Sequence, residues 1–119
     1  MAKVLVVDDE PLIAMLLADW LEEQGVEVIG PAHTVAQAMA LIEEGKVDAA
    51  VLDVSLAEGK SYAAADLLAS KGIPFAFATG HGAEGIDPRF KDIQIISKPF
   101  NFDGVQKMLA ALLKRVPQA

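Results

Sequence analysis

Short apolar runs alternate with segments of helical periodicity from one end of the chain to the other. Each run is four or five residues long and mostly apolar, which is typical of strands covered on both faces. The predicted strands are Lys3–Val7, Val26–Ile29, Asp48–Leu52, Pro74–Ala78 and Ile93–Ile96. Between these runs, apolar residues recur every three or four positions, as they do along one face of an amphipathic helix.

Residues that favour helix starts and ends lie before and after the segments of helical periodicity. Pro11 suits the first turn of a helix, and Gly25 suits the position just beyond its end. Thr34 and Gln37 have the spacing of a capping box, which predicts a second helix that stops at Gly45. The remaining helices are expected over Ser61–Lys71 and after the capping residue Asn101.

The alternation of strands and helices indicates βαβ units and therefore a parallel sheet. Glu27 and Gln94 put polar side chains inside the second and fifth strands, which suits the two edges of the sheet. The first, third and fourth strands have the composition of buried, central strands. A strand order of 2-1-3-4-5 satisfies both conditions, so the sequence predicts an α/β fold: a doubly wound, five-stranded parallel sheet of the flavodoxin-like type.

One interval interrupts this pattern. Residues 80–92 lie where a fourth helix is due, but three glycines and a proline leave few consecutive helix formers there. We therefore expect a degenerate fourth helix, in the form of a loop or a distorted turn, between the last two strands.

Composition narrows the class of protein. At 119 residues the chain has room for one domain, residues 1–119, and 53% hydrophobic residues can fill its core. A net charge of −7 argues against nucleic-acid binding, which requires Lys and Arg to neutralise phosphates. No apolar run approaches the ~20 residues that span a bilayer, no secretory signal follows Met1, and there is no cysteine for disulfides or thiolate metal sites. We expect a cytoplasmic monomer with no membrane or nucleic-acid partner.

Polar residues gather where the predicted strands end. Asp8 and Asp9 follow the first strand, Asp53 the third, Thr79 the fourth and Lys98 the fifth. The carboxyl ends of parallel strands meet at one edge of the sheet, where doubly wound proteins bind their ligands. The first and third strands are neighbours in the predicted order, roughly 4.8 Å apart, so their three aspartates are expected to crowd together.

Crowded carboxylates require compensating positive charge. Two of them repel by about 4 kcal/mol when they are roughly 4 Å apart in an effective dielectric near 20. Lys98 supplies one positive charge, and an all-oxygen site suits Mg²⁺ as the source of two more. We expect Asp9 and Asp53 to hold Mg²⁺, with Asp8 mainly in its outer sphere, while Lys98 and the Thr79 hydroxyl face a bound phosphoryl group.

Each of these residues also has an ordinary structural explanation. Asp9 suits the N-cap of the helix that follows it, Asp8 suits a solvated turn, and Asp53 suits the start of an ordinary turn. Thr79 suits a strand end, and the stem of Lys98 suits the edge of the core. The functional interpretation depends on all five sharing one edge of one sheet.

Four motifs carry a resemblance to a known family. They are Val-Val-Asp8-Asp9-Glu10-Pro11, Leu-Asp53-Val, Ala-Thr79-Gly80 and Ser-Lys98-Pro99-Phe100. In this order they resemble the receiver domain of two-component response regulators, over nearly the whole chain. The resemblance implies that Asp53 accepts a phosphoryl group from a phosphohistidine and that Asp8 and Asp9 form the acid pair for Mg²⁺. It also implies that Thr79 is the switch hydroxyl and Lys98 the phosphate partner.

The resemblance has further implications, and the chain departs from the family pattern in places. It implies that the backbone carbonyl of Ser55 is a magnesium ligand and that the Lys98–Pro99 bond is cis. The usual receiver has proline four residues after the phosphoacceptor, where this chain has Ala57. The usual switch aromatic is replaced by Ile95, so coupling between a threonine and an aromatic rotamer cannot operate in the ordinary way.

The fourth strand and the loop after it look like those of the stand-alone receivers known as the FATGUY group. The matching segment is Pro74-Phe75-Ala76-Phe77-Ala78-Thr79-Gly80, although Gly82 stands where that motif ends in tyrosine. We hypothesise that Thr79 moves toward a new phosphoryl group and pulls residues 80–92 with it, helped by the freedom of Gly80. His81 lies where receivers often carry a residue that tunes hydrolysis, and an exposed loop histidine is the simpler interpretation.

The sequence therefore predicts a single-domain response regulator that is not an enzyme toward other substrates. Its expected partners are a histidine kinase or histidine phosphotransfer protein and a downstream protein. One alternative is a Mg²⁺-dependent phosphohydrolase, although such enzymes place a second acid where this chain has Ser55. The other alternative is a receiver module trimmed from a larger regulator.

Overall fold

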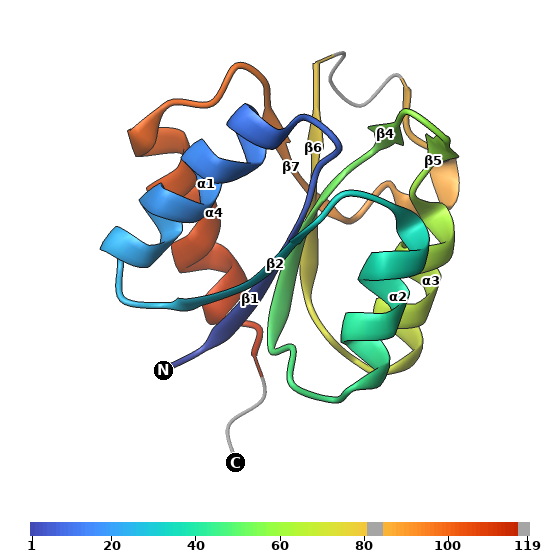
Figure 1. Cartoon of the computed structure of the whole chain (residues 1–119), viewed down its shortest axis with the longest axis horizontal. Coiled ribbons are helices and arrows are strands. Elements are labelled where there is room, and N and C mark those ends of the chain that lie inside the picture. Colours follow the sequence, from blue (N-terminus) through green and yellow to red (C-terminus); the bar gives the residue numbers. More distant parts are fainter. Residues whose placement is uncertain (81–84, 117–119) are drawn as a thin grey trace.

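The computed structural model describes residues 1–80 and 85–116. Within these residues, short strands alternate with helices and with one 3-10 turn, η2 (Figure 1). The elements are β1 (Lys3–Val7), α1 (Pro11–Glu23), β2 (Glu27–Ala32), α2 (Val35–Glu43), β3 (Ala49–Asp53), β4 (Ser55–Leu56), β5 (Gly59–Lys60), α3 (Tyr62–Ser70), β6 (Phe75–Thr79), η2 (Pro88–Phe90), β7 (Gln94–Ser97) and α4 (Phe102–Leu113).

The main sheet has five parallel strands in the order β2-β1-β3-β6-β7, which confirms the predicted fold and strand order. Glu27 and Gln94 lie in the two edge strands, as their polarity indicated. The predicted ends of four strands were wrong: β3, β6 and β7 extend one residue further, and β2 continues past Ile29 to Ala32. Asp53, Thr79 and Ser97 are thus the last residues of strands and are held by the sheet itself.

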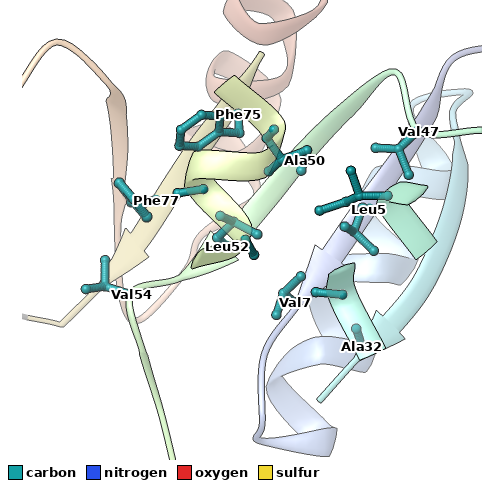
Figure 2. Packing of buried hydrophobic residues seen from close by; sticks show 14 of the residues in the cluster. Leu5, Val7, Ala32, Val47, Ala50, Leu52, Val54, Phe75 and Phe77 are labelled. Atoms are coloured by element: carbon teal, nitrogen blue, oxygen red, sulfur yellow. The ribbon is translucent and has the colours of Figure 1, made fainter. Parts of the chain in front are cut away.

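Helices cover both faces of this sheet: α1 and α4 lie on one face, and α2 and α3 on the other (Figure 1). Because side chains alternate along a strand, Val4 and Val6 pack with α1 and α4, whereas Leu5 and Val7 pack with α2 and α3. Figure 2 shows the second of these two cores, in which Leu5 and Phe77 come from different strands of the sheet.

The starts of α1, α2 and α4 agree with the sequence, whereas α3 begins at Tyr62, one residue after the predicted Ser61. Pro11 is the first residue of α1, and Asn101 caps α4 by accepting a hydrogen bond from the Gly104 amide at 2.7 Å. Thr34 accepts from the Gln37 amide at 3.1 Å, but the Gln37 side chain accepts from the amide of His33 instead of that of Thr34. The return bond of the predicted capping box is therefore displaced by one residue.

A short turn lies in the described part of the interval between β6 and β7. Its Phe90 packs against Tyr62 of α3 and Phe77 of β6. Residues 85–92 contain η2 and no α-helix, in agreement with the degenerate fourth helix. Phe90 is 7% exposed, and its ring centroid lies 5.2 Å from that of Tyr62 and 5.3 Å from that of Phe77. The Phe90 ring is therefore packed between rings that come from α3 and β6.

Two features were not predicted from the sequence. Residues 55–60 form a small antiparallel hairpin, in which Ser55 pairs with Lys60 and Leu56 with Gly59. Strand β2 has an irregular register against β1 at Gly30, where a Cβ atom would lie 2.7 Å from the backbone nitrogen of Ala32. A glycine is required at that bend. None of the described helices is both long and apolar enough to cross a bilayer.

Candidate phosphoacceptor site

Asp53 is fixed at the carboxyl end of the central strand β3. It is 6% exposed and pairs with Ala78 of β6. The buried Ser61 hydroxyl donates to the Asp53 carbonyl oxygen at 2.7 Å, and the Ser55 amide donates to Asp53 Oδ1 at 3.2 Å. These contacts hold both the backbone and the carboxylate of Asp53.

The turn after β1 brings two more aspartates to the same place. Asp8 is 2% exposed, and its Oδ1 accepts from the Glu10 amide at 2.9 Å, which rules out a solvated turn. Nδ1 of His33 lies 2.8 Å from the Asp8 carbonyl oxygen. Asp9 does not cap α1, because Glu10 occupies the cap position. Instead, Asp9 Oδ2 accepts from the Ala57 amide at 2.6 Å.

Lys98 reaches these carboxylates from the end of β7. Its Nζ lies 2.9 Å from Asp53 Oδ2, 3.0 Å from Asp8 Oδ2 and 3.5 Å from Glu10 Oε1. The Lys98 amide also donates to the Thr79 carbonyl oxygen, so its backbone continues the ladder between β6 and β7. The Lys98–Pro99 bond is cis, as the family resemblance implied. The predicted meeting of Asp8, Asp53 and Lys98 is therefore confirmed.

Burial and the neighbouring charges together shift the pKa values of Asp53 and Lys98. Burial raises the pKa of Asp53 above its ordinary value, and the charge of Asp8 adds to the rise, while Lys98 opposes it. Burial acts to lower the pKa of Lys98, but its hydrogen bonds to Asp53 and Asp8 outweigh burial and raise that pKa. Lys98 is consequently a permanent cation at neutral pH.

Four carboxylates form what we call the acid cluster: Asp8, Asp9, Glu10 and Asp53. One oxygen of each lies within 4.8 Å of the others. With Lys98 as the cation that contacts three of them, the group carries an excess of negative charge. Hard oxygen donors with excess negative charge fit a small divalent cation such as Mg²⁺. Asp9 and Asp53 remain the predicted direct ligands, with Asp8 mainly in the outer sphere.

Of the residues expected to act in switching, Thr79 lies next to Lys98, whose amide donates to the Thr79 carbonyl oxygen. Thr79 is 6% exposed at the end of β6, and Gly80 after it is exposed. Ile95 is half-buried in β7, where it pairs with Phe77. His81 lies outside the described residues. The role of the Ser55 carbonyl as a metal ligand, like the movement of Thr79, stays a prediction.

Several contacts of the site were not predicted from the sequence. They involve the Ala57 amide, the Ser61 hydroxyl and the His33 ring. The replacement of the usual proline by Ala57 was a visible signal, since it restores an amide donor. Nothing in the local pattern distinguishes Ser61 from an ordinary residue at a helix start.

The five-stranded parallel sheet carries the acid cluster and Lys98 at its carboxyl edge. A family model for the response regulator receiver domain matches residues 4–110. The chain therefore belongs to the family of receiver domains of two-component response regulators. Membership in the FATGUY group stays a prediction.

Individual relatives agree with this assignment. Phyllosphere-induced regulator PhyR of Methylorubrum extorquens is 34% identical over an alignment that covers 93% of this chain and 43% of PhyR. Transcriptional regulatory protein PdtaR of Mycobacterium tuberculosis is 34% identical over an alignment that covers 83% of this chain and 50% of PdtaR. The chain thus spans about half the length of these curated relatives.

One solved structure matches this chain over nearly the whole length of both proteins. The solution structure of SdrG from Sphingomonas melonis Fr1 is similar with a TM-score of 0.84 and 50% sequence identity. The match covers 95% of this chain and 97% of that chain. This chain and the SdrG structure therefore correspond in extent as well as in fold.

Proposed function

We propose that this chain is a single-domain response regulator that accepts a phosphoryl group from a phosphohistidine on Asp53, with Mg²⁺ bound at the acid cluster. The observation that carries the proposal is the placement of Lys98 Nζ 2.9 Å from Asp53 Oδ2 and 3.0 Å from Asp8 Oδ2. A buried carboxylate with a fixed cation beside it and further carboxylates around it suits nucleophilic attack on a phosphoryl group.

The transfer exchanges one bond to phosphorus for another. A carboxylate oxygen of Asp53 attacks phosphorus while the bond from phosphorus to the donor imidazole nitrogen breaks. The imidazole leaves with that electron pair and takes up a proton, and Asp53 becomes an acyl phosphate. Lys98 would neutralise one phosphoryl oxygen, and the Thr79 hydroxyl would donate to another. When bound, Mg²⁺ supplies positive charge to the phosphoryl oxygens.

One compared structure supports phosphoryl binding by a protein of similar length to this chain. SdrG, which is 51% identical to this chain in a second structure, was solved in a conformation described as BeF3-activated. Beryllium fluoride imitates a phosphoryl group on a carboxylate. We propose that Asp53 of this chain binds the same mimic, and that the phosphorylated chain signals or relays by contacts with other proteins in the cytoplasm.

An apolar patch beside the acid cluster suits the docking of a protein donor. Its members are Leu12, Met15 and Leu16 of α1 and Phe102 of α4, which are 78%, 54%, 38% and 39% exposed. Helix α1 begins directly after Glu10, and α4 begins four residues after Lys98, so both helices start near the edge of the sheet that carries the acid cluster. We propose that a histidine kinase or histidine phosphotransfer protein contacts this patch.

Acetyl phosphate tests the proposal without a protein partner. Incubation with acetyl phosphate and Mg²⁺ is expected to add one labile phosphoryl group, detected by intact mass spectrometry. The adduct should be absent in Asp53→Asn and without Mg²⁺, while Asp19→Asn, at an exposed position of α1, serves as the matched control. A stable adduct on another residue would contradict the assignment of Asp53. Turnover of small phosphate esters would favour the phosphohydrolase alternative.

A further inference from the structure

The backbone amide of Ala57 contacts the acid cluster from a hairpin 48 residues further along the chain. It donates to Asp9 Oδ2 at 2.6 Å. We propose that Ala57 is a positioning residue for cation binding, whose amide holds the Asp9 carboxylate in the acid cluster. This inference rests on the proposed function, because it assigns a role toward the Mg²⁺ that the proposed function requires.

Asp9 needs such a contact more than its neighbours do. Within the part of the chain that the structure describes, Lys98 pairs with Asp8, Glu10 and Asp53 but not with Asp9. Asp9 is also only partly buried, so repulsion from the other carboxylates favours rotation of its side chain toward solvent. A hydrogen bond from an amide to a carboxylate is charge-assisted and opposes this rotation.

The hairpin that carries Ala57 is itself fixed at three points. The Leu56 side chain is 6% exposed and belongs to the core beneath α2 and α3. Glu58 Oε1 accepts from the Val35 amide at the start of α2, at 2.5 Å. Lys60 Nζ donates to Ser55 Oγ across the hairpin at 2.9 Å. The Ala57 amide is therefore a donor with a defined direction.

The contact leaves Asp9 free to act as a ligand. The hydrogen bond from Ala57 is made to Oδ2 of Asp9. A carboxylate has a second oxygen, so this bond does not exclude Asp9 from binding a cation. The Ala57 amide would not contact the metal itself but would orient a carboxylate that does, as outer-shell hydrogen-bond donors do. Removal of such a donor typically weakens metal binding about 10–100-fold.

Position 57 is also where this chain departs from the receiver pattern, which has proline there. Proline has no amide hydrogen, so a chain with that residue cannot make this bond to Asp9. The Ala57 side chain is exposed, and the residue is the first of two between the paired Leu56 and Gly59. Proline is favoured at this position of many tight turns, so the substitution is compatible with the fold.

Mg²⁺ titration of three proteins by isothermal calorimetry tests the inference. Ala57→Pro is expected to bind Mg²⁺ about tenfold more weakly than the wild-type chain. Ala57→Ser keeps the amide and is expected to bind within about twofold of the wild type, which separates the amide from the side chain. Equal binding by Ala57→Pro and the wild type, or equal weakening in both variants, would overturn the role of Ala57.

A second measurement does not depend on the proline variant. In metal-free protein, Asp9→Ala is expected to speed hydrogen exchange of the Ala57 amide several-fold, as measured by NMR. Unchanged exchange would show that Asp9 does not hold this amide and would overturn the inference. Failure of the wild-type chain to bind Mg²⁺ at all would instead contradict the proposed function.

Discussion

Asp53 ends a buried strand with 6% of its surface exposed, next to Asp8, which is 2% exposed. Burial and the neighbouring charge raise the pKa of Asp53, so its ionised form is less favourable in the folded chain than in the unfolded one. Lys98 offsets part of this cost but is shared with Asp8 and Glu10. The residue that serves the proposed chemistry is thus one that destabilises the fold.

Asp53→Asn is therefore expected to raise the free energy of unfolding of the metal-free chain, by on the order of 1 kcal/mol at pH 7. A raised pKa means that stability falls as the pH rises through the folded pKa of Asp53. Below its ordinary value of 3.8, the carboxyl is protonated in both states and the advantage of asparagine should vanish. Urea unfolding across this pH range measures both effects. Lower stability of Asp53→Asn at pH 7 would contradict the argument, and the exposed Asp19→Asn serves as control.

At the scale of elements, the segment between β6 and β7 is held by contacts to α3. The Tyr62 hydroxyl accepts from the Asp87 amide at 2.8 Å and donates to the Gly85 carbonyl oxygen at 3.2 Å. The Arg89 guanidinium pairs with Asp66 of α3 and lies 4.2 Å from the Phe90 ring centroid. These contacts fix the described residues of this segment, which include the short turn η2.

Tyr62→Phe removes the hydroxyl while keeping the ring that stacks on Phe90. The loss of its two hydrogen bonds is expected to lower the free energy of unfolding by about 1 kcal/mol. Residues 85–90 should exchange their amide hydrogens faster, whereas β1 should exchange as in the wild type. Hydrogen exchange with mass spectrometry resolves the two regions. Unaltered exchange in residues 85–90 would mean that the hydroxyl does not anchor the segment.

Some secondary-structure elements can be predicted from sequence patterns, and others cannot. The strands and helices of the main sheet were predicted because each has its own apolar periodicity. The β4–β5 hairpin was missed because strands of two residues have no periodicity, and because its anchors, Leu56 and Glu58, act through distant partners. Strand ends at Asp53 and Thr79 were missed by one residue, since polar residues normally indicate that a strand has stopped.

For the whole molecule, the apolar patch on α1 and α4 distinguishes a protein donor from a small-molecule donor, because only the protein donor is proposed to contact it. Leu12→Ser changes a residue that is 78% exposed, so the fold should be unaffected. Transfer from a phosphorylated protein donor that is active on the wild-type chain is expected to slow about tenfold, the effect of losing one important interface contact. Phosphorylation by acetyl phosphate should not change. If Leu12→Ser and the wild-type chain accept the phosphoryl group from the protein donor at the same rate, Leu12 is not part of the docking surface.

The sequence by itself determined the strand order and the edge at which Asp8, Asp53, Thr79 and Lys98 meet. Strand periodicity and the parallel arrangement suffice for this, because parallel strands bring their carboxyl ends together. Only the tertiary structure decided how each carboxylate is held. The bonds from Lys98 to Asp53 and from Ala57 to Asp9 join residues 45 and 48 positions apart. Such contacts depend on side-chain direction and backbone position after folding, which local patterns do not encode.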